Sequence, residues 1–286
     1  MHKRIWSFIL ISVLVFTILF DNYALAANKN INLNAKAVYA ATIDGKVIYS
    51  YNADKQLGIA STSKIMTYLL SRELMKKHNI KSTTQIIPKI TKMPNDAVTI
   101  PLSSKKKVSL SSLLSTMMAI SANNSAEALR YYFSSIEKKD FITLMNNKAK
   151  SLNMKNTNFI NASGITENGK YNKSTARSMY LLARETILKY PEVLQYTNKQ
   201  YIVFENKKLP TTFSSLLSTG IDGLKTGYTA AAGNCIVATA TIKINNKSKR
   251  VIIVILGAQS SNQRKSDLIK LLALAKEFVK KNYSKT

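Results

Sequence analysis

Two runs of apolar residues near the start of the chain and a longer stretch near its end predict β-strands. Residues 35–53 (AKAVYAATIDGKVIYSYNA) contain two runs rich in β-branched and aromatic residues around Asp44 and Gly45, a pattern typical of a β-hairpin. Toward the other end, residues 222–244 and 250–259 are predicted as two long strands separated by the polar turn 245–249.

Helical periodicity dominates the middle of the chain. Residues 61–77 form a predicted helix with Ser61 as its cap candidate, and their apolar side chains cover much of the circumference, which indicates a central, buried helix. Residues 78–108 contain three prolines and are predicted as loops with short strands. Further helices are predicted over 108–120, 125–136, 138–152, 174–189 and 262–281.

Strands at both ends with helices between them predict an α+β fold. The antiparallel sheet would be built from the N- and C-terminal strands, with the helical region inserted between them. A functional cleft is expected where the sheet and the helical region meet, because ligand sites collect at such seams.

The first 26 residues are predicted to be a signal peptide. His2, Lys3 and Arg4 precede an apolar block from Ile5 to Phe20, and small residues follow around Ala26, as in export signals. An uncleaved anchor is the alternative, although the block is slightly short for a membrane span. Residues 27–286 are then expected to form a single domain.

Composition narrows the chemistry that this domain can use. Cys235 is the only cysteine, so no internal disulfide can form, and it is expected to be a buried small apolar residue. Beyond the signal, His78 is the only histidine and lies in a polar stretch. Multi-histidine metal sites are therefore excluded and no cofactor is expected. A nucleophilic serine would have a lysine as its natural base.

The formal net charge of +27 indicates an anionic partner. The lysines are spread along the chain rather than gathered with aromatic residues, so no nucleic acid is expected. For an exported protein, an anionic envelope polymer or membrane surface is the favoured partner.

Three short motifs suggest a reaction centre. Ser61 and Lys64 in STSK (61–64) are three residues apart on a helix and so share one face, although a serine at a helix start followed by a lysine is by itself common. SAN (121–123) and KTG (225–227) follow. The three motifs in this order match the set of penicillin-binding proteins and class A β-lactamases.

The flanking residues make the resemblance closer. IASTSKIMT, SANNSAEAL, FINASGI, YNKSTARSM and DGLKTGYTAAAGNCIVATA resemble the D-alanyl-D-alanine carboxypeptidases, the low-molecular-mass penicillin-binding proteins. This resemblance extends from about residue 36 to the final helix. It implies a β-lactamase/transpeptidase-like fold and a serine acyl-enzyme that removes the terminal D-alanine of peptidoglycan stem peptides. It also implies covalent inhibition by β-lactam antibiotics and a place in the periplasm or cell envelope.

The resemblance assigns roles to the catalytic residues. Ser61 would be the nucleophile and Lys64 its general base, while Ser121 would relay protons. Asn123 would orient Lys64 or hold the substrate's amide. A lysine base must be desolvated or lie beside another cation to be neutral at working pH, and Lys225 could be that cation.

The KTG motif would recognise the substrate. Lys225 and Thr226, at the start of a predicted edge strand, would bind the D-alanine carboxylate. Gly227 would let the substrate backbone approach closely. The backbone N–H groups of Ser61 and Tyr228 would form the oxyanion hole.

Departures from the family pattern leave some assignments open. Many members have histidine where Tyr228 stands, and the segment before KTG lacks the usual auxiliary carboxylate contacts, for which Arg264 is a possible substitute. The small β-rich domain and amphipathic anchor of many relatives are not expected after the catalytic domain.

The sequence also leaves rival functions. A serine β-lactamase shares the chemistry but needs a glutamate-activated water; Glu167 lies in a polar loop without a recognisable partner, and Glu192 has the wrong context. A non-catalytic envelope-binding module on the same fold is the third reading. Carboxypeptidase and endopeptidase preferences are not distinguished.

Overall fold

The computed structural model describes residues 31–245 and 247–283. Residues 32–286 group into one compact unit. The predicted signal peptide, residues 1–26, lies outside the described residues. Among the helices of the described residues, none has the length and apolar character needed to cross a bilayer.

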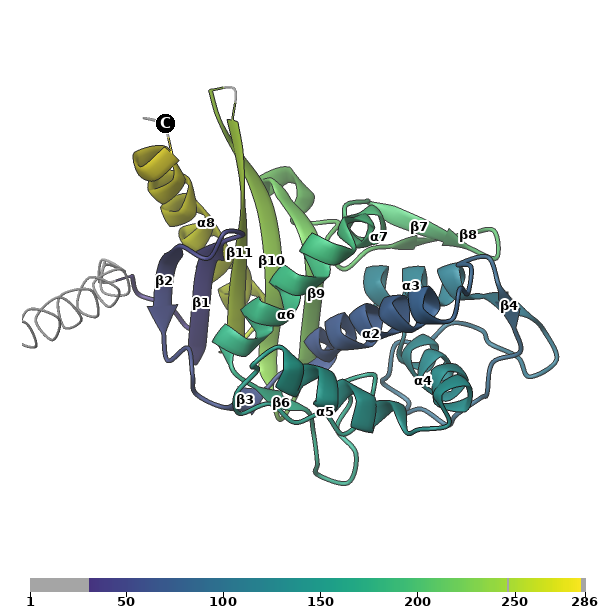
Figure 1. Ribbon diagram of the computed structural model, residues 1–286. Helices are drawn as coiled ribbons and strands as arrows, with labels where there is room; N and C mark the ends of the chain where they lie inside the picture. Colours follow the sequence, from purple (N-terminus) through teal and green to yellow (C-terminus); the bar gives the residue numbers. More distant parts are fainter. Residues whose placement is uncertain (1–30, 246, 284–286) are drawn as a thin grey trace, which may run out of the picture. The chain divides into compact units, whose positions relative to one another are not determined.

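A five-stranded antiparallel sheet is built from both ends of this unit, as predicted (Figure 1). Its order is β2-β1-β11-β10-β9. The strands are β1 (Ala37–Thr42), β2 (Val47–Tyr51), β9 (Ile221–Thr229), β10 (Gly233–Ile244) and β11 (Lys247–Ala258). The hairpin of β1 and β2 around Asp44 and Gly45 is confirmed, and β9 lies at the edge of the sheet.

The prediction of one strand over residues 222–244 was wrong, because a turn at 230–232 divides it into β9 and β10. The backbone N–H of Ala232 donates to the carbonyl oxygen and to the Oγ1 of Thr229, both over 3.1 Å. Gly233 then adopts φ +70°, a conformation that glycine reaches without strain. The alanine-rich turn sequence gave no polar interruption that would have revealed this turn.

Helices cover both faces of the sheet. In β11, every residue from Val251 to Leu256 is fully buried, which is expected only when neither face of a strand meets water. Ile252, Val254 and Leu256 belong to the main core shared with the helical region. The alternate residues face the opposite side, where α8 (Ser261–Tyr283) packs on β10 and β11. On the main-core side, α6 (Ala176–Lys189) packs on β1 and β11.

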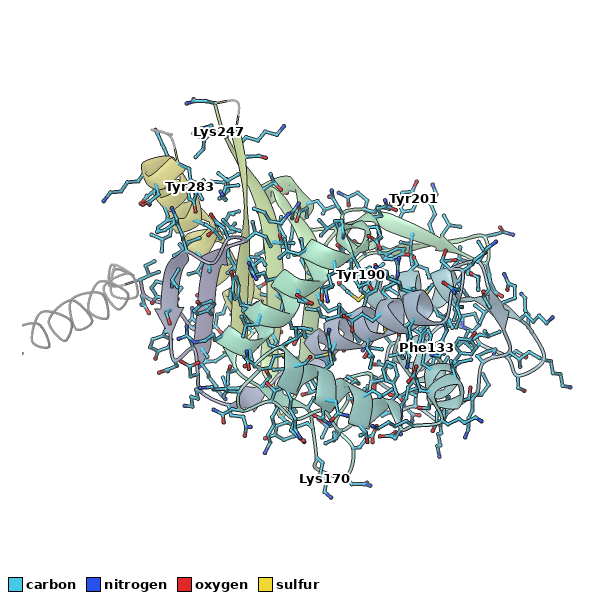
Figure 2. The ribbon with its side chains drawn as sticks, in the orientation of Figure 1. Phe133, Lys170, Tyr190, Tyr201, Lys247 and Tyr283 are labelled. Carbon is cyan, nitrogen blue, oxygen red and sulfur yellow. The ribbon has the colours of Figure 1, made fainter. Side chains whose placement is uncertain are left out.

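The inserted region is helical and surrounds α2 (Lys64–Lys77), which is buried over ten of its residues as predicted. Around it pack α3 (Leu110–Ala119), α4 (Asn123–Glu137) and α5 (Phe141–Ser151). Ser109, Asp140 and Thr175 cap α3, α5 and α6 with side-chain hydrogen bonds. Figure 2 shows Phe133 within this region, Lys170 projecting from a loop and Lys247 at the start of β11.

Short elements complete the unit. They are β3 (Leu57–Gly58) with β6 (Lys173–Ser174), β4 (Gln85–Ile86) with β5 (Val108–Ser109), the 3-10 helices η3 (Pro191–Val193) and η4 (Leu217–Thr219), and α7 (Leu194–Thr197). A hairpin of β7 (Tyr201–Phe204) and β8 (Lys207–Pro210) was not predicted. Its second strand is too polar to stand out from a loop in the sequence.

Candidate active site

Ser61 lies in a 3-10 turn, η2 (Ala60–Ser63), that leads directly into α2. Its prediction as a helix cap was wrong, since no side chain caps η2 or α2. The hydroxyls of Thr62 and Ser63 donate to the carbonyls of Ile59 (2.5 Å) and Ala60 (2.6 Å). These local hydrogen bonds satisfy main-chain acceptors and hold the turn in place. The side chain of Ser61 is only partly buried.

The backbone around Ser61 is strained. Ala60 is buried and adopts φ +45°, a left-handed conformation that costs a residue with a Cβ about 1–2 kcal/mol. Such strain concentrates at functional sites, where the surroundings hold it in place. The backbone conformation of Ala60 therefore helps to orient Ser61, the next residue of the turn.

Lys64 is the first residue of α2 and is fully buried. Its Nζ donates to Ser61 Oγ over 2.9 Å, to Asn123 Oδ1 over 2.8 Å and to the Ser163 carbonyl over 2.5 Å. The structure thus brings the predicted nucleophile and base into direct contact, and it also fixes the amine from two other sides.

Burial and charge lower the pKa of Lys64 well below its usual value. Desolvation is the larger cause, because the charged ammonium loses its water, and the positive charge of Lys225 acts in the same direction. The carboxylate of Glu127 opposes both. A lysine amine that is neutral near neutral pH can accept a proton from a serine hydroxyl.

Asn123 begins α4, and its side chain orients Lys64 rather than facing solvent. Its Oδ1 accepts from Lys64, while its Nδ2 and its backbone N–H both donate to the Val98 carbonyl, over 3.1 and 2.8 Å. Ser121, two residues earlier, is almost fully buried and has φ +70°. The turn that carries SAN is therefore strained like the one that carries Ser61.

The KTG motif lies in the middle of β9, not at its start. Lys225 is fully buried, its Nζ donates to the Thr226 carbonyl over 2.9 Å, and burial beside Arg264 lowers its pKa to about 7. Tyr228 is 64% exposed, so its side chain faces away from the core. The role predicted for this residue, a backbone N–H in the oxyanion hole, does not involve the side chain.

Gly227 brings the edge strand against the turn of Ser61. A Cβ at Gly227 would lie 2.8 Å from the Ser61 nitrogen and 3.0 Å from the Thr62 nitrogen, closer than real Cβ atoms approach. Only glycine lets β9 pass so near η2.

The loop at 161–164 also contacts Ser61 and Lys64, although no role was predicted for it and its NASG residues only contributed to the resemblance. The Ser163 carbonyl accepts from Lys64 Nζ, and Ser61 Oγ lies 3.5 Å from the same oxygen. Gly164 has φ +81° and a Cβ there would lie within 3.0 Å of the Ser61 nitrogen. In the sequence, the only sign of this contact was a glycine after polar residues, a pattern that many turns share.

Other candidate residues lie elsewhere or have other contacts. His78 is exposed at the end of α2, beside Glu137, and Cys235 is buried as predicted.

Glu192 pairs with Arg72 at 2.7 Å. The expectation that Glu167 lacks a partner was wrong, because Asn161 Nδ2 donates to it over 3.1 Å. Arg264 Nη1 donates to the Cys235 carbonyl over 3.4 Å.

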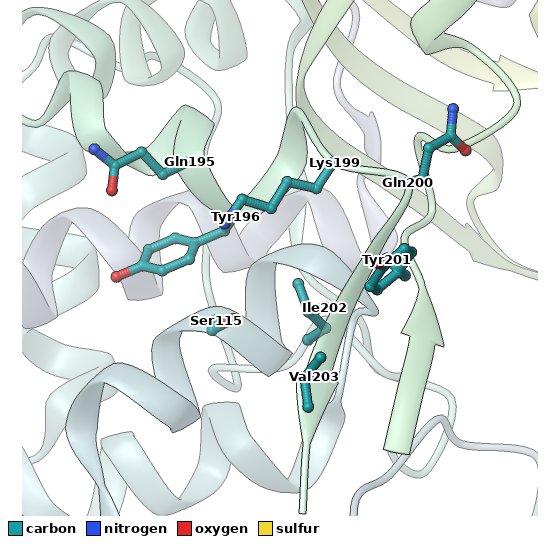
Figure 3. A pocket seen from close by; sticks show the side chains of 8 residues that line it. All are labelled: Ser115, Gln195, Tyr196, Lys199, Gln200, Tyr201, Ile202 and Val203. Carbon is teal, nitrogen blue, oxygen red and sulfur yellow. The ribbon is translucent and has the colours of Figure 1, made fainter. Parts of the chain in front are cut away.

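Within residues 31–245 and 247–283, no cluster of three or more His, Cys, Asp or Glu residues is arranged to hold a metal ion. A cavity of about 590 Å³ lies between α3, α7 and β7 (Figure 3), and none of the predicted catalytic residues lines it. The arrangement at Ser61 is instead that of a nucleophile, a desolvated amine and a strand edge, which suits acyl transfer.

Comparison with known proteins gives the family. Residues 25–260 match the model of the D-alanyl-D-alanine carboxypeptidase family, peptidase family S11. The chain is 30% identical to the D-alanyl-D-alanine carboxypeptidase DacF of Bacillus subtilis over 283 residues, covering 96% of this chain and 71% of DacF. It is 32% identical to DacC of Escherichia coli over 275 residues, covering 92% and 67%.

A solved structure agrees with this match. The cefotaxime-bound crystal structure of penicillin-binding protein D2 from Listeria monocytogenes is 34% identical, with a TM-score of 0.77 over 86% of this chain and 99% of that protein. The predicted fold class is thereby confirmed. The chain belongs to the D-alanyl-D-alanine carboxypeptidase family of serine peptidases, the low-molecular-mass penicillin-binding proteins.

Proposed function

We propose that this protein removes the terminal D-alanine from peptidoglycan stem peptides through an ester on Ser61, with Lys64 as general base. The observation that carries this proposal is the contact of a fully buried Lys64 amine with Ser61 Oγ over 2.9 Å. Burial lowers the pKa of that amine, so it can take the hydroxyl proton as the bond to the substrate forms.

Acylation follows from this geometry. Ser61 Oγ attacks the carbonyl carbon between the two D-alanines, and its proton moves to Lys64. The carbon–nitrogen bond then breaks, and the departing D-alanine amine receives this proton from Lys64, with Ser121 as the proposed relay. In the second half-reaction water hydrolyses the ester: its oxygen joins the carbonyl carbon and one of its protons restores the Ser61 hydroxyl.

Substrate recognition is assigned to β9. The backbone N–H groups of Ser61 and Tyr228 would hold the oxyanion, since Gly227 lets the two segments approach. Protonated Lys225 and the hydroxyl of Thr226 would bind the D-alanine carboxylate. Asn123 would act mainly by holding Lys64, because its amide nitrogen already donates to Val98.

β-Lactams are proposed as covalent inhibitors at the same serine, an inference supported by the cefotaxime complex of the Listeria protein. Because peptidoglycan lies outside the cytoplasmic membrane, we also propose that residues 1–26 direct export. The net charge of +27 would favour loose, salt-sensitive contact with anionic envelope surfaces.

One experiment tests the reaction. Purified protein is incubated with a pentapeptide ending in D-Ala-D-Ala, and free D-alanine is measured beside the Ser61→Ala variant. We expect release by the wild type and none by the variant. A fluorescent penicillin followed by peptide mass mapping should place the adduct on Ser61; an adduct that persists in Ser61→Ala would overturn the proposal.

A further inference from the structure

The main chain at residues 98–100 holds Asn123, one of the residues that bind the Lys64 amine. The Val98 carbonyl accepts both the backbone N–H of Asn123 (2.8 Å) and its Nδ2 (3.1 Å). Since Nδ2 is held by Val98, the other end of the same amide, Oδ1, faces Lys64 at 2.8 Å. The position of the Val98 carbonyl therefore determines which end of the Asn123 amide meets the lysine.

Asn124 holds this segment against α4. Its Oδ1 accepts from the Ile100 backbone N–H over 3.1 Å, and its Nδ2 donates to the Ile100 carbonyl over 2.7 Å. One side chain thus pairs with both main-chain groups of one residue, as a neighbouring strand would. Ile100 is itself 4% exposed, so the pair is partly shielded from water.

Besides the bonds to Asn123 and Asn124, the backbone hydrogen bonds of this segment are local. The Ala97 N–H donates to Pro94 and the Leu102 N–H donates to Ile100, and neither bond links the segment to α4. The segment belongs to the long connection from α2 to α3, whose regular structure in the described residues is limited to the two-residue strands β4 and β5. Apart from Asn123 itself, Asn124 therefore supplies the hydrogen-bonded link to α4 that local structure does not.

We infer that Asn124 is a positioning residue of the reaction: by fixing Ile100 and Val98 it keeps the Asn123 amide, and through it Lys64, aligned on Ser61. The hydrogen-bonded path runs from Asn124 to Ile100, along the main chain to Val98, then through Asn123 and Lys64 to Ser61. Asn124 contacts neither Ser61 nor Lys64 in this path. The inference rests on the proposed function, because it assumes that Lys64 activates Ser61.

Acylation kinetics with a fluorescent penicillin test the inference, since saturation curves separate the noncovalent dissociation constant from the acylation rate constant. In Asn124→Ala we expect the rate constant to fall about 10- to 100-fold, because small misplacements of a catalytic group have effects of this size. The dissociation constant should stay within about twofold, as β9 is untouched. Asn124→Asp keeps the acceptor for Ile100 and should recover part of the rate.

Asn146→Ala is the matched control. Asn146 pairs in the same way with Phe159, accepting from its N–H over 2.9 Å and donating to its carbonyl over 2.8 Å. The loop after Phe159 has further side-chain supports, including Asn172, which accepts from the Ile160 N–H, and Thr67, which donates to the Ala162 carbonyl. We expect a similar loss of melting temperature in both alanine variants but a near-normal acylation rate constant in Asn146→Ala.

The results distinguish the possible failures. Equal loss of acylation in Asn124→Ala and Asn146→Ala, or a normal rate constant in folded Asn124→Ala, would show that Asn124 is only structural. If the wild type itself forms no adduct on Ser61, the proposed function fails instead. Measurements on Asn124→Asp keep the comparison possible if the alanine variant does not fold.

Discussion

Gly227 and the nitrogen of Ser61 are in contact across the boundary between the sheet and the helical region. A Cβ placed on Gly227 would lie 2.8 Å from that nitrogen, so the edge strand passes Ser61 too closely for a side chain to fit between them. The two residues are 166 positions apart in the sequence, and their contact closes one side of the proposed oxyanion hole.

Gly227→Ala should disable acylation while the protein stays folded. The added methyl must move β9 away from η2, which separates the two proposed oxyanion donors, and we expect the acylation rate constant to fall about 100-fold or more. The measurement is adduct formation with a fluorescent penicillin. Gly169→Ala is the control for a strained alanine that meets no neighbour, because Gly169 has φ +72° and no atom lies within 4 Å of its added Cβ; a Gly227→Ala enzyme as fast as this control would contradict the close approach.

Lys64→Arg should lose acylation even though it keeps a positive charge. A guanidinium stays protonated at working pH and cannot take the Ser61 proton, so we expect a loss of at least about 1000-fold. Stopped-flow adduct formation measures it. Near-normal acylation in Lys64→Arg would mean that another group accepts the proton.

The second-order rate constant for acylation should follow a bell-shaped pH curve. In the proposed mechanism Lys64 must be neutral, so the rate should rise as pH increases through its lowered pKa. The proposed mechanism also needs protonated Lys225 to bind the substrate carboxylate, so the rate should fall as pH increases through about 7. In Lys225→Arg the falling limb should shift to higher pH, and an unchanged limb there would assign it to a different group.

Lys225 should destabilise the fold at neutral and acidic pH. Its pKa is about 7 in the folded state and near 10.4 in an unfolded chain, so the unfolded state binds more protons between these values. Stability therefore rises with pH over that interval. Lys225→Met should raise the free energy of unfolding by about 4–5 kcal/mol at pH 6, where the whole pKa difference counts, and by much less at pH 10. Urea unfolding of the wild type and the variant at the two pH values measures this change. An equal effect of the substitution at both pH values would contradict the lowered pKa of buried Lys225.

The lifetime of the penicilloyl ester should separate a carboxypeptidase from a β-lactamase. Either enzyme would form an ester on Ser61, but rapid loss of the bulky adduct needs a water activated by a further base. Glu192 is paired with Arg72, and Glu167 accepts from Asn161 in an exposed loop. We expect peptide turnover to exceed penicillin turnover when both are measured on one preparation. The reverse order would favour a β-lactamase.

The sequence by itself predicted most of the regular elements and the type of chemistry that we propose. The buried α2, the hairpin of β1 and β2, and the helices after it follow from periodicity within a few residues of each position. The order STSK, SAN and KTG, together with the lack of a second histidine beyond the signal, indicated a serine and lysine mechanism. Each of these signals lies within a short stretch of residues, so it can be recognised in the sequence without the three-dimensional structure.

Only the tertiary structure decided how the site is assembled. The third partner of Lys64 is the Ser163 main-chain carbonyl, a group that every residue carries and that no sequence pattern marks. The strand break at 230–232 and the clamp of Asn124 on Ile100 likewise depend on neighbours brought together by folding. Side-chain type predicts what a residue can do, but burial and contact between distant segments determine the pKa of Lys64 and the partners it meets.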